Sequence, residues 1–359
     1  MALSPRFAFI EIARVACIFI VVLMHTNELA VVGASSTPLT LAISPAVRFV
    51  VPVFLMISGL LLGLRHRDPG YRVDARDFWG RRAQTLILPF FVWNIVYMFI
   101  LVVIPGKPIF NAQTLFNVTT GYVHLYFVIV LLQCLALYTF LARFFSARAL
   151  RVCVLLAALS SFAFYAISEN LLWTLGPDEH MFEWCYGKLV FGWAVFFFWG
   201  VLLGYQAGAL ERLNQNRYWL LLAALGAYVP YWLETQSELV RLGALARDYF
   251  LLSGLLYQFI AANAFLAFFY GWEPHIPNNR FAKCLVGWGK YMFGVYVAHL
   301  AVLVYLVPLW NQLLPTVPLS IEIAVVTTLT FFITLAFVRL CSMPPFGFLG
   351  ALLFGGRGK

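Results

Sequence analysis

The sequence predicts an all-α polytopic membrane protein with about ten transmembrane helices and both termini in the cytoplasm. Of its 359 residues, 63% are hydrophobic and 11% are charged, whereas a soluble domain is about 45–50% apolar and about 25% charged. The mean hydropathy of +0.87 favours the same class. The stretch after Met1 lacks a small-residue cleavage site and stays apolar for longer than a signal-peptide core, so we expect no cleaved leader.

The expected helices are apolar runs of about 20 residues, the length that crosses a bilayer. They lie near 7–31, 43–63, 84–104, 121–142, 149–168, 186–208, 217–233, 248–271, 286–310 and 320–341. No repeat of fixed period divides them. We therefore expect one integral-membrane domain over 1–345, a short cytoplasmic tail over 346–359 and no appended soluble domain.

The basic residues predict the orientation. Most of the 24 Lys and Arg residues fall in segments that face the cytoplasm when the N-terminus is inside, above all in residues 65–82, "RHRDPGYRVDARDFWGRR". This bias predicts cytoplasmic termini, and it explains the net charge of +9 without nucleic acid as a partner. The six cysteines show no close Cys/His spacing, so we expect no metal site.

The first expected helix carries Glu11, Arg14 and His25 within an otherwise apolar run. On an α-helix Arg14 and His25 point the same way, about three turns or about 16 Å apart. Glu11 lies three residues before Arg14, close enough to form an ion pair that keeps Arg14 ionised. Ionisable groups inside a span usually line a cavity or pathway. The alternative is a structural Glu–Arg pair beside a core histidine.

Four further fragments follow in order along the chain. They are "VPVFLMISGLLLG" with Ser58 and Gly59, "RRAQTLILPFFVW" with Arg81, Arg82, Thr85, Pro89 and Trp93, "HLYFV" with the stretch from His124 to Phe127, and "GKYMFGVYVAH" with Met292, Tyr296 and His299. Together with the first helix they resemble the membrane acyltransferase 3 family of bacterial O-acyltransferases over most of the chain. Three positions depart from the family pattern: Glu11 replaces an aspartate, Thr85 the second arginine of Arg-x-x-Arg, and Met292 a common serine.

The resemblance implies transfer of an acyl group, acetyl by expectation, from cytoplasmic acyl-CoA to a hydroxyl. The acceptor is an envelope or secreted polysaccharide or its lipid-linked precursor, and the protein resides in the bacterial cytoplasmic (inner) membrane. A homodimer or a polysaccharide synthesis complex is compatible with this function. Acyl transfer to a hydroxyl needs a base near the acceptor oxygen, and histidine is the natural base near neutral pH.

The expected site residues fall into three groups. The catalytic residues are His25 and Glu11, the acyl-CoA-binding residues are Arg14, Arg81 and Arg82, and the acceptor or pocket residues are His124, Tyr296, His299 and Ser58. The Arg-rich loop suits the cofactor's phosphates because arginine forks pair well with them. For the acceptor group, aromatic-belt, capping and packing roles remain open, and Ser58-Gly59 favours helix packing. His66 is expected to be a solvated loop residue.

Two other classes of function remain open. Intramembrane Glu, Arg and His would also fit a proton-coupled secondary transporter, although no inverted repeat is visible and these groups concentrate in the first helix. An assembly subunit of a polysaccharide export complex is the third class. Binding of acyl-CoA to the purified protein separates the enzyme from both.

Overall fold

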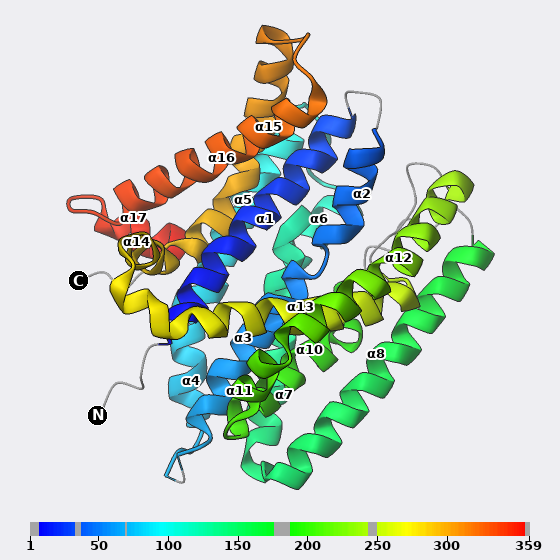
Figure 1. Ribbon diagram of the computed structural model, residues 1–359. Helices are drawn as coiled ribbons and strands as arrows, with labels where there is room; N and C mark the ends of the chain where they lie inside the picture. The colour runs from blue at the N-terminus through cyan, green and yellow to red at the C-terminus, as the bar shows by residue number, and fades with distance from the viewer. Residues whose placement is uncertain (1–6, 33–36, 69, 176–186, 243–249, 356–359) are drawn as a thin grey trace. The chain divides into compact units, whose positions relative to one another are not determined.

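The computed structural model describes residues 7–32, 37–68, 70–175, 187–242 and 250–355. Within these ranges the chain forms helices, turns and loops and no β-strand (Figure 1). Eight helical stretches there are long and apolar enough to cross a membrane. The predicted class, an all-α polytopic membrane protein, is confirmed, and the orientation of its termini stays a prediction.

Eight of the predicted segments correspond to these spans. The predicted span 186–208 corresponds to a helix pair, α10 (Ala194–Tyr205) and α11 (Ala209–Gln215), bent by 105° at its break, which would make a ninth span. The predicted span 217–233 lies in α12 (Arg217–Leu242), whose aromatic, proline and charged residues keep it below the hydropathy of the other spans. The predicted segment is therefore helical, but it is not among the apolar candidates.

The chain divides into two compact units, each described here by itself. Unit 1 comprises residues 1–17, 42–73 and 130–287, and unit 2 comprises residues 18–41, 74–129 and 288–359. Four helices contribute to both units: α1 (Ala8–Val32), α2 (Pro38–Val47), α7 (Tyr126–Leu141) and α14 (Arg280–Gly289). Unit 1 also holds α3 (Val50–Arg65), η4 (Ala142–Phe144), α8 (Ala147–Leu175), η5 (Val190–Gly192), α10, α11, α12, α13 (Leu252–Trp272) and η7 (Glu273–Asn278). Unit 2 also holds α4 (Ala75–Arg82), η1 (Ala83–Ile87), α5 (Leu88–Met98), η2 (Phe99–Val103), α6 (Ala112–Thr120), η3 (Val123–Leu125), α15 (Met292–Leu313), α16 (Leu319–Cys341) and α17 (Gly347–Phe354).

The core of unit 1 is built on the contact between α3 and α10. Gly59 of α3 lies so close to α10 that an added Cβ would stand 2.1 Å from the carbonyl oxygen of Phe197, and Gly200 makes the same approach to Met56 on α3. Small residues allow helix backbones to approach in this way where lipid provides no hydrophobic drive. The packing role predicted for Ser58-Gly59 is therefore confirmed for Gly59.

Proline explains where one predicted span is interrupted. The span predicted over 43–63 consists of α2 and α3, with a turn at Arg48 and Phe49. Pro52 has no N–H to donate to the carbonyl four residues earlier, that of Arg48, and its ring crowds that carbonyl. The helix consequently restarts at Val50.

In unit 2, the helical segment that contains Thr85 widens into the π-helix η1. Pro89 cannot donate to the Thr85 carbonyl, so the regular α-helical bond is missing at this point. Gly355, with φ of +69°, approaches the same residue, and an added Cβ there would lie 2.6 Å from the Thr85 oxygen. Nearby, the Trp93 indole donates to the Leu353 carbonyl at 2.9 Å. Part of the segment predicted as a tail, 346–359, is thus the helix α17, packed against α5.

Apolar side chains on the outer faces fit a lipid environment. On α8, Leu155, Leu159 and Phe162 are each more than half exposed. Patches of such residues are rare on soluble monomers, whereas a helix in a bilayer satisfies its own backbone and can present apolar side chains to lipid. The protein is accordingly an integral membrane protein.

Candidate functional site

Three histidines from distant parts of the sequence meet in unit 2. His25 comes from α1, His124 from η3 and His299 from α15, and their relative exposures are 8%, 3% and 0%. The ring centroids of His124 and His299 are 4.7 Å apart, and His25 lies 5.4 Å from His299 and 5.8 Å from His124. The structure therefore brings the predicted base and two predicted acceptor residues into one cluster, called here the histidine cluster.

Hydrogen bonds to one carbonyl assign the tautomers of two of these rings. The Tyr296 carbonyl accepts from His124 Nε2 at 3.0 Å and from His299 Nδ1 at 2.6 Å. A neutral imidazole donates through one nitrogen and accepts through the other. His124 Nδ1 and His299 Nε2 are therefore acceptors, and within the described part of the chain these buried atoms have no hydrogen-bond partner.

Two tyrosines fix this arrangement. The Tyr296 hydroxyl donates to the His124 carbonyl, which makes the link between α15 and η3 reciprocal. The Tyr97 hydroxyl of α5 donates to the Val297 carbonyl at 2.7 Å, and its ring meets that of His124 edge-on at 5.4 Å. Tyr296, predicted as a pocket residue, thus orients both neighbouring histidines through its backbone oxygen as well as through its ring.

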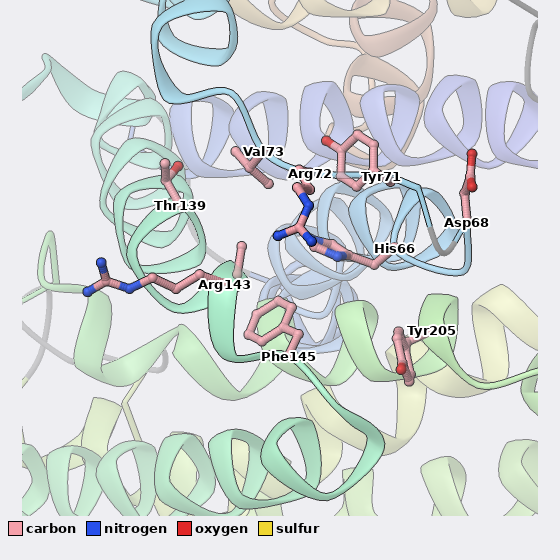
Figure 2. A pocket seen from close by; sticks show the side chains of 10 residues that line it. His66, Asp68, Tyr71, Arg72, Val73, Thr139, Arg143, Phe145 and Tyr205 are labelled. Carbon is pink, nitrogen blue, oxygen red and sulfur yellow. The ribbon is translucent and has the colours of Figure 1, made fainter.

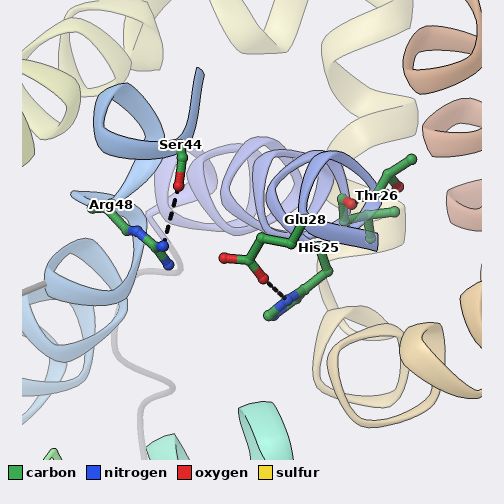
Figure 3. Close-up of polar contacts among 6 residues, drawn as sticks. His25, Thr26, Glu28, Ser44 and Arg48 are labelled. Atoms are coloured by element: carbon green, nitrogen blue, oxygen red, sulfur yellow. Dashed lines mark hydrogen bonds and ion pairs between the residues drawn. The ribbon is translucent and has the colours of Figure 1, made fainter. Parts of the chain in front are cut away.

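His25 differs from the other two histidines because it has a carboxylate partner. Its Nδ1 lies 2.9 Å from Glu28 Oε2, one helical turn further along α1 (Figure 3). The sequence analysis named Glu11, Arg14 and His25 as the ionisable groups of the first helix, and the structure adds Glu28 to them. The signal was present in the sequence, since residues three apart share a helix face.

Clustered histidines are common metal ligands. Among the described residues, no group of three or more His, Cys, Asp or Glu side chains is arranged to hold a metal ion. The expected independence from metal stays a prediction.

The predicted pair of Glu11 and Arg14 exists in unit 1. Arg14 Nη1 lies 3.1 Å from Glu11 Oε1, and the two side chains are 30% and 25% exposed. The N-terminus of α1 is held nearby by Glu273, whose carboxylate accepts from the backbone N–H groups of Ala8 and Phe9 at 3.2 and 2.6 Å. The ion pair predicted from the spacing is confirmed, and both of its side chains are partly exposed.

Ser58 and the two arginines at the end of α4 have local partners. Ser58 in unit 1 donates to the Phe54 carbonyl at 2.8 Å, a bond within its own helix. In unit 2, Arg81 pairs with Asp77 at 2.5 Å. The Arg82 guanidinium lies 3.7 Å from the centre of the Phe78 ring. Their predicted roles in acceptor and acyl-CoA binding stay predictions.

One loop histidine is not the solvated residue that the sequence analysis expected. His66 is half-buried at the end of α3, and the rings of Tyr71, Tyr138 and Phe145 surround its imidazole at 5.0–5.5 Å. Burial lowers the pKa of His66. The correction arises because Tyr138 and Phe145 are distant in sequence, so the loop composition around residue 66 does not reveal them.

Comparison with known proteins gives one family and a set of distant relatives. The profile of a family described as an acyltransferase domain, acyltransferase 3, matches residues 7–339. Proteins from Staphylococcus aureus strains MSSA476 and MW2, each named "Probable poly-beta-1,6-N-acetyl-D-glucosamine export protein", are 23% identical over 237 residues, which is 63% of this chain and 64% of each relative. The match thus spans just under two thirds of the curated relatives' length. No solved structure matches the chain.

Proposed function

Because the chain belongs to the acyltransferase 3 family, we propose that it is an integral-membrane O-acyltransferase. It transfers an acyl group, acetyl by expectation, from cytoplasmic acyl-CoA to a hydroxyl of an envelope or secreted polysaccharide or of its lipid-linked precursor. It works in the bacterial cytoplasmic membrane with both termini in the cytoplasm. The contact between His25 and Glu28, inside a buried histidine cluster, is the observation that carries this proposal.

The chemistry assigned to His25 follows from that contact. With Nδ1 engaged by Glu28, Nε2 is the ring nitrogen that takes a proton from the acceptor hydroxyl. The hydroxyl oxygen then bonds to the thioester carbonyl carbon, the C–S bond breaks, and the proton passes from His25 to the departing thiolate. The Glu28 carboxylate stabilises the imidazolium between these steps, as an acidic partner does for other histidine bases.

His124 and His299 suit the acceptor substrate. Each has a buried acceptor nitrogen without a partner among the described residues, and a sugar offers several hydroxyl donors. A site built to accept hydrogen bonds from hydroxyls discriminates strongly against ligands that lack them, because its buried polar atoms would stay unpaired. The names of the Staphylococcus relatives refer to a poly-N-acetylglucosamine polymer, which supports a polysaccharide acceptor here.

The remaining predicted residues keep their roles as part of the proposal. Glu11 keeps its predicted catalytic role and neutralises Arg14. Arg14, and separately Arg81 and Arg82, keep their predicted role in binding the acyl-CoA donor. The guanidinium groups of these arginines would use their bidentate fit to phosphate or carbonyl oxygens. A homodimer or a polysaccharide synthesis complex stays compatible with this activity.

The test compares His25→Ala with the unaltered protein in two assays. Surface glycans of cells with and without each protein are compared by mass spectrometry, and acyl transfer is followed with purified protein. A general base contributes about 10²–10⁴-fold to rate, so His25→Ala should be inserted normally and lose acylation by that factor. Near-normal transfer by the variant would overturn the assignment of His25.

The name of the Staphylococcus aureus relatives makes export of a polysaccharide the second candidate function. Under that function, loss of the protein would reduce the amount of exported polymer without changing its acylation. Loss of acyl groups at an unchanged amount of polymer would exclude export as the main activity.

A further inference from the structure

Unit 1 contains a cavity that the histidine chemistry does not use. Its volume is about 480 Å³, within the range of about 300–1,000 Å³ typical of small-molecule sites. It lies where α3, α7 and α10 end, and the loop after α3 crosses it. Its lining includes His66, Asp68, Tyr71, Arg72, Arg143 and Phe145.

The lining combines cationic groups with aromatic surfaces. In Figure 2, the Arg72 and His66 side chains gather near Phe145, whereas Arg143 extends away from them. The Arg143 guanidinium is held over the rings of Phe140 and Phe144, at 5.1 and 4.7 Å. Arg72 is therefore the cation placed to meet a ligand, and arginine pairs bidentately with phosphate.

The arginines at this cavity could have a role other than ligand binding, because three helix C-termini meet there. Each C-terminus carries roughly half a negative charge and attracts cations, so the arginines could simply balance the helix ends. Arg67 does this, since its guanidinium donates to the Gln206 carbonyl at 2.7 Å. Among the described residues, neither Arg72 nor Arg143 donates to a helix-end carbonyl. The positive charges of Arg72 and Arg143 are therefore not explained by the capping of these helices.

The other titratable groups leave the cavity cationic. Asp68 is the acidic residue of the lining, and one of its carboxylate oxygens accepts from the Gly70 N–H at 3.0 Å. Burial lowers the pKa of His66, so this ring is neutral at neutral pH and does not add charge. Two guanidinium groups against one carboxylate leave an excess of positive charge beside aromatic rings.

We propose that this cavity binds the nucleotide end of coenzyme A, with a phosphate on Arg72 and the adenine against Tyr71 and Phe145. The assignment rests on the proposed acyl-CoA donor. Aromatic faces stack on every nucleobase, and a phosphate-bearing base needs both a cation and such a face. The site belongs to the most basic loop of the chain, which the positive-inside rule places in the cytoplasm, where coenzyme A is present. It is separate in sequence from Arg81 and Arg82.

The experiment measures binding of coenzyme A and of adenosine 3′,5′-bisphosphate to the full chain in nanodiscs of neutral lipid. Loss of a hydrogen bond to a charged group reduces affinity about tenfold or more, so Arg72→Ala should weaken binding of both probes by that factor. Arg76→Ala, the same change at an exposed arginine in the first turn of α4 and outside the cavity lining, should bind within about twofold of the unaltered chain. Tyr71→Leu should weaken binding and Tyr71→Phe should not, because only the first removes the ring.

Each outcome decides one question. Unchanged coenzyme A affinity in Arg72→Ala overturns this cavity assignment and leaves the proposed function intact. Loss of binding in Arg81→Ala with Arg82→Ala, but not in Arg72→Ala, transfers the site to α4. If Arg72→Ala leaves coenzyme A binding unchanged in neutral nanodiscs but lowers the amount of anionic lipid that co-purifies with the chain, the cavity is a headgroup site and the proposal fails. If the unaltered chain binds no coenzyme A while His25→Ala abolishes acylation, the donor in the proposed function is wrong and the cavity assignment fails with it.

Discussion

Replacing Glu28 by glutamine tests the histidine chemistry most directly. Glutamine has the same shape and its amide oxygen can still accept from His25 Nδ1, but it carries no charge to stabilise an imidazolium. The contact is 2.9 Å long, and the side chains of His25 and Glu28 are 10% and 37% exposed. A hydrogen bond to a charged group contributes about 1.5–3 kcal/mol. Because Glu28 is more than a third exposed, we take the lower part, about 1.5–2 kcal/mol, which corresponds to about 10- to 30-fold in rate.

The assay is acyl transfer by purified protein, with kcat and KM measured separately, beside the melting temperature of each variant. We expect Glu28→Gln to lower kcat by that factor with little change in the KM for acyl-CoA. Glu28→Ala should lose more activity, and Glu28→Asp, which keeps the charge, should recover part of it. A Glu28→Gln protein that melts and transfers acyl groups like the unaltered chain would refute the claim that this carboxylate assists His25.

Three further predictions concern other parts of the molecule. Converting Arg81 and Arg82 together to alanine should weaken acyl-CoA binding in a salt-dependent way if they contact phosphates, and an unchanged affinity at low salt would leave them only a topological role. Arg14→Ala should lower the free energy of unfolding by about 1–3 kcal/mol in detergent melting experiments, a value between those of exposed and buried ion pairs. Glu11→Asp should be tolerated. Equal melting temperatures for all variants would contradict a stabilising pair. The lowered pKa of His66 means that the unfolded chain binds a proton more readily than the folded one, so stability should fall as pH drops below about 6.5, and this loss should shrink in His66→Gln.

Local periodicity explains which features could be predicted from the sequence. Apolar runs located the spans, because a bilayer demands about 20 apolar residues in each. The contact of Glu11 with Arg14 followed from their spacing of three on one helix, and the structure contains it. The same rule applied to His25 would have found Glu28. Glu28 could therefore have been predicted as the partner of His25, because the two residues lie only three apart in the sequence.

Long-range contacts were beyond such reasoning. His124 and Tyr296 are linked by two hydrogen bonds across a separation of 172 residues, and no periodicity within either segment indicates this. Only the family resemblance suggested that they share a pocket. The burial of His66 was missed for the same reason, because the rings of Tyr138 and Phe145 come from another helix and the loop that follows it.

The histidine cluster assigns different roles to chemically identical side chains through their partners. His124 and His299 each donate to the Tyr296 carbonyl, a neutral oxygen that fixes a tautomer but cannot balance an added proton. His25 has the carboxylate of Glu28 instead, and an ionised acceptor makes a hydrogen bond roughly twice as strong as a neutral one. In the proposed mechanism the proton of the acceptor hydroxyl is therefore assigned to His25. In the same proposal the other two rings, whose second nitrogens have no partner among the described residues, bind the hydroxyl groups of the substrate that His25 deprotonates.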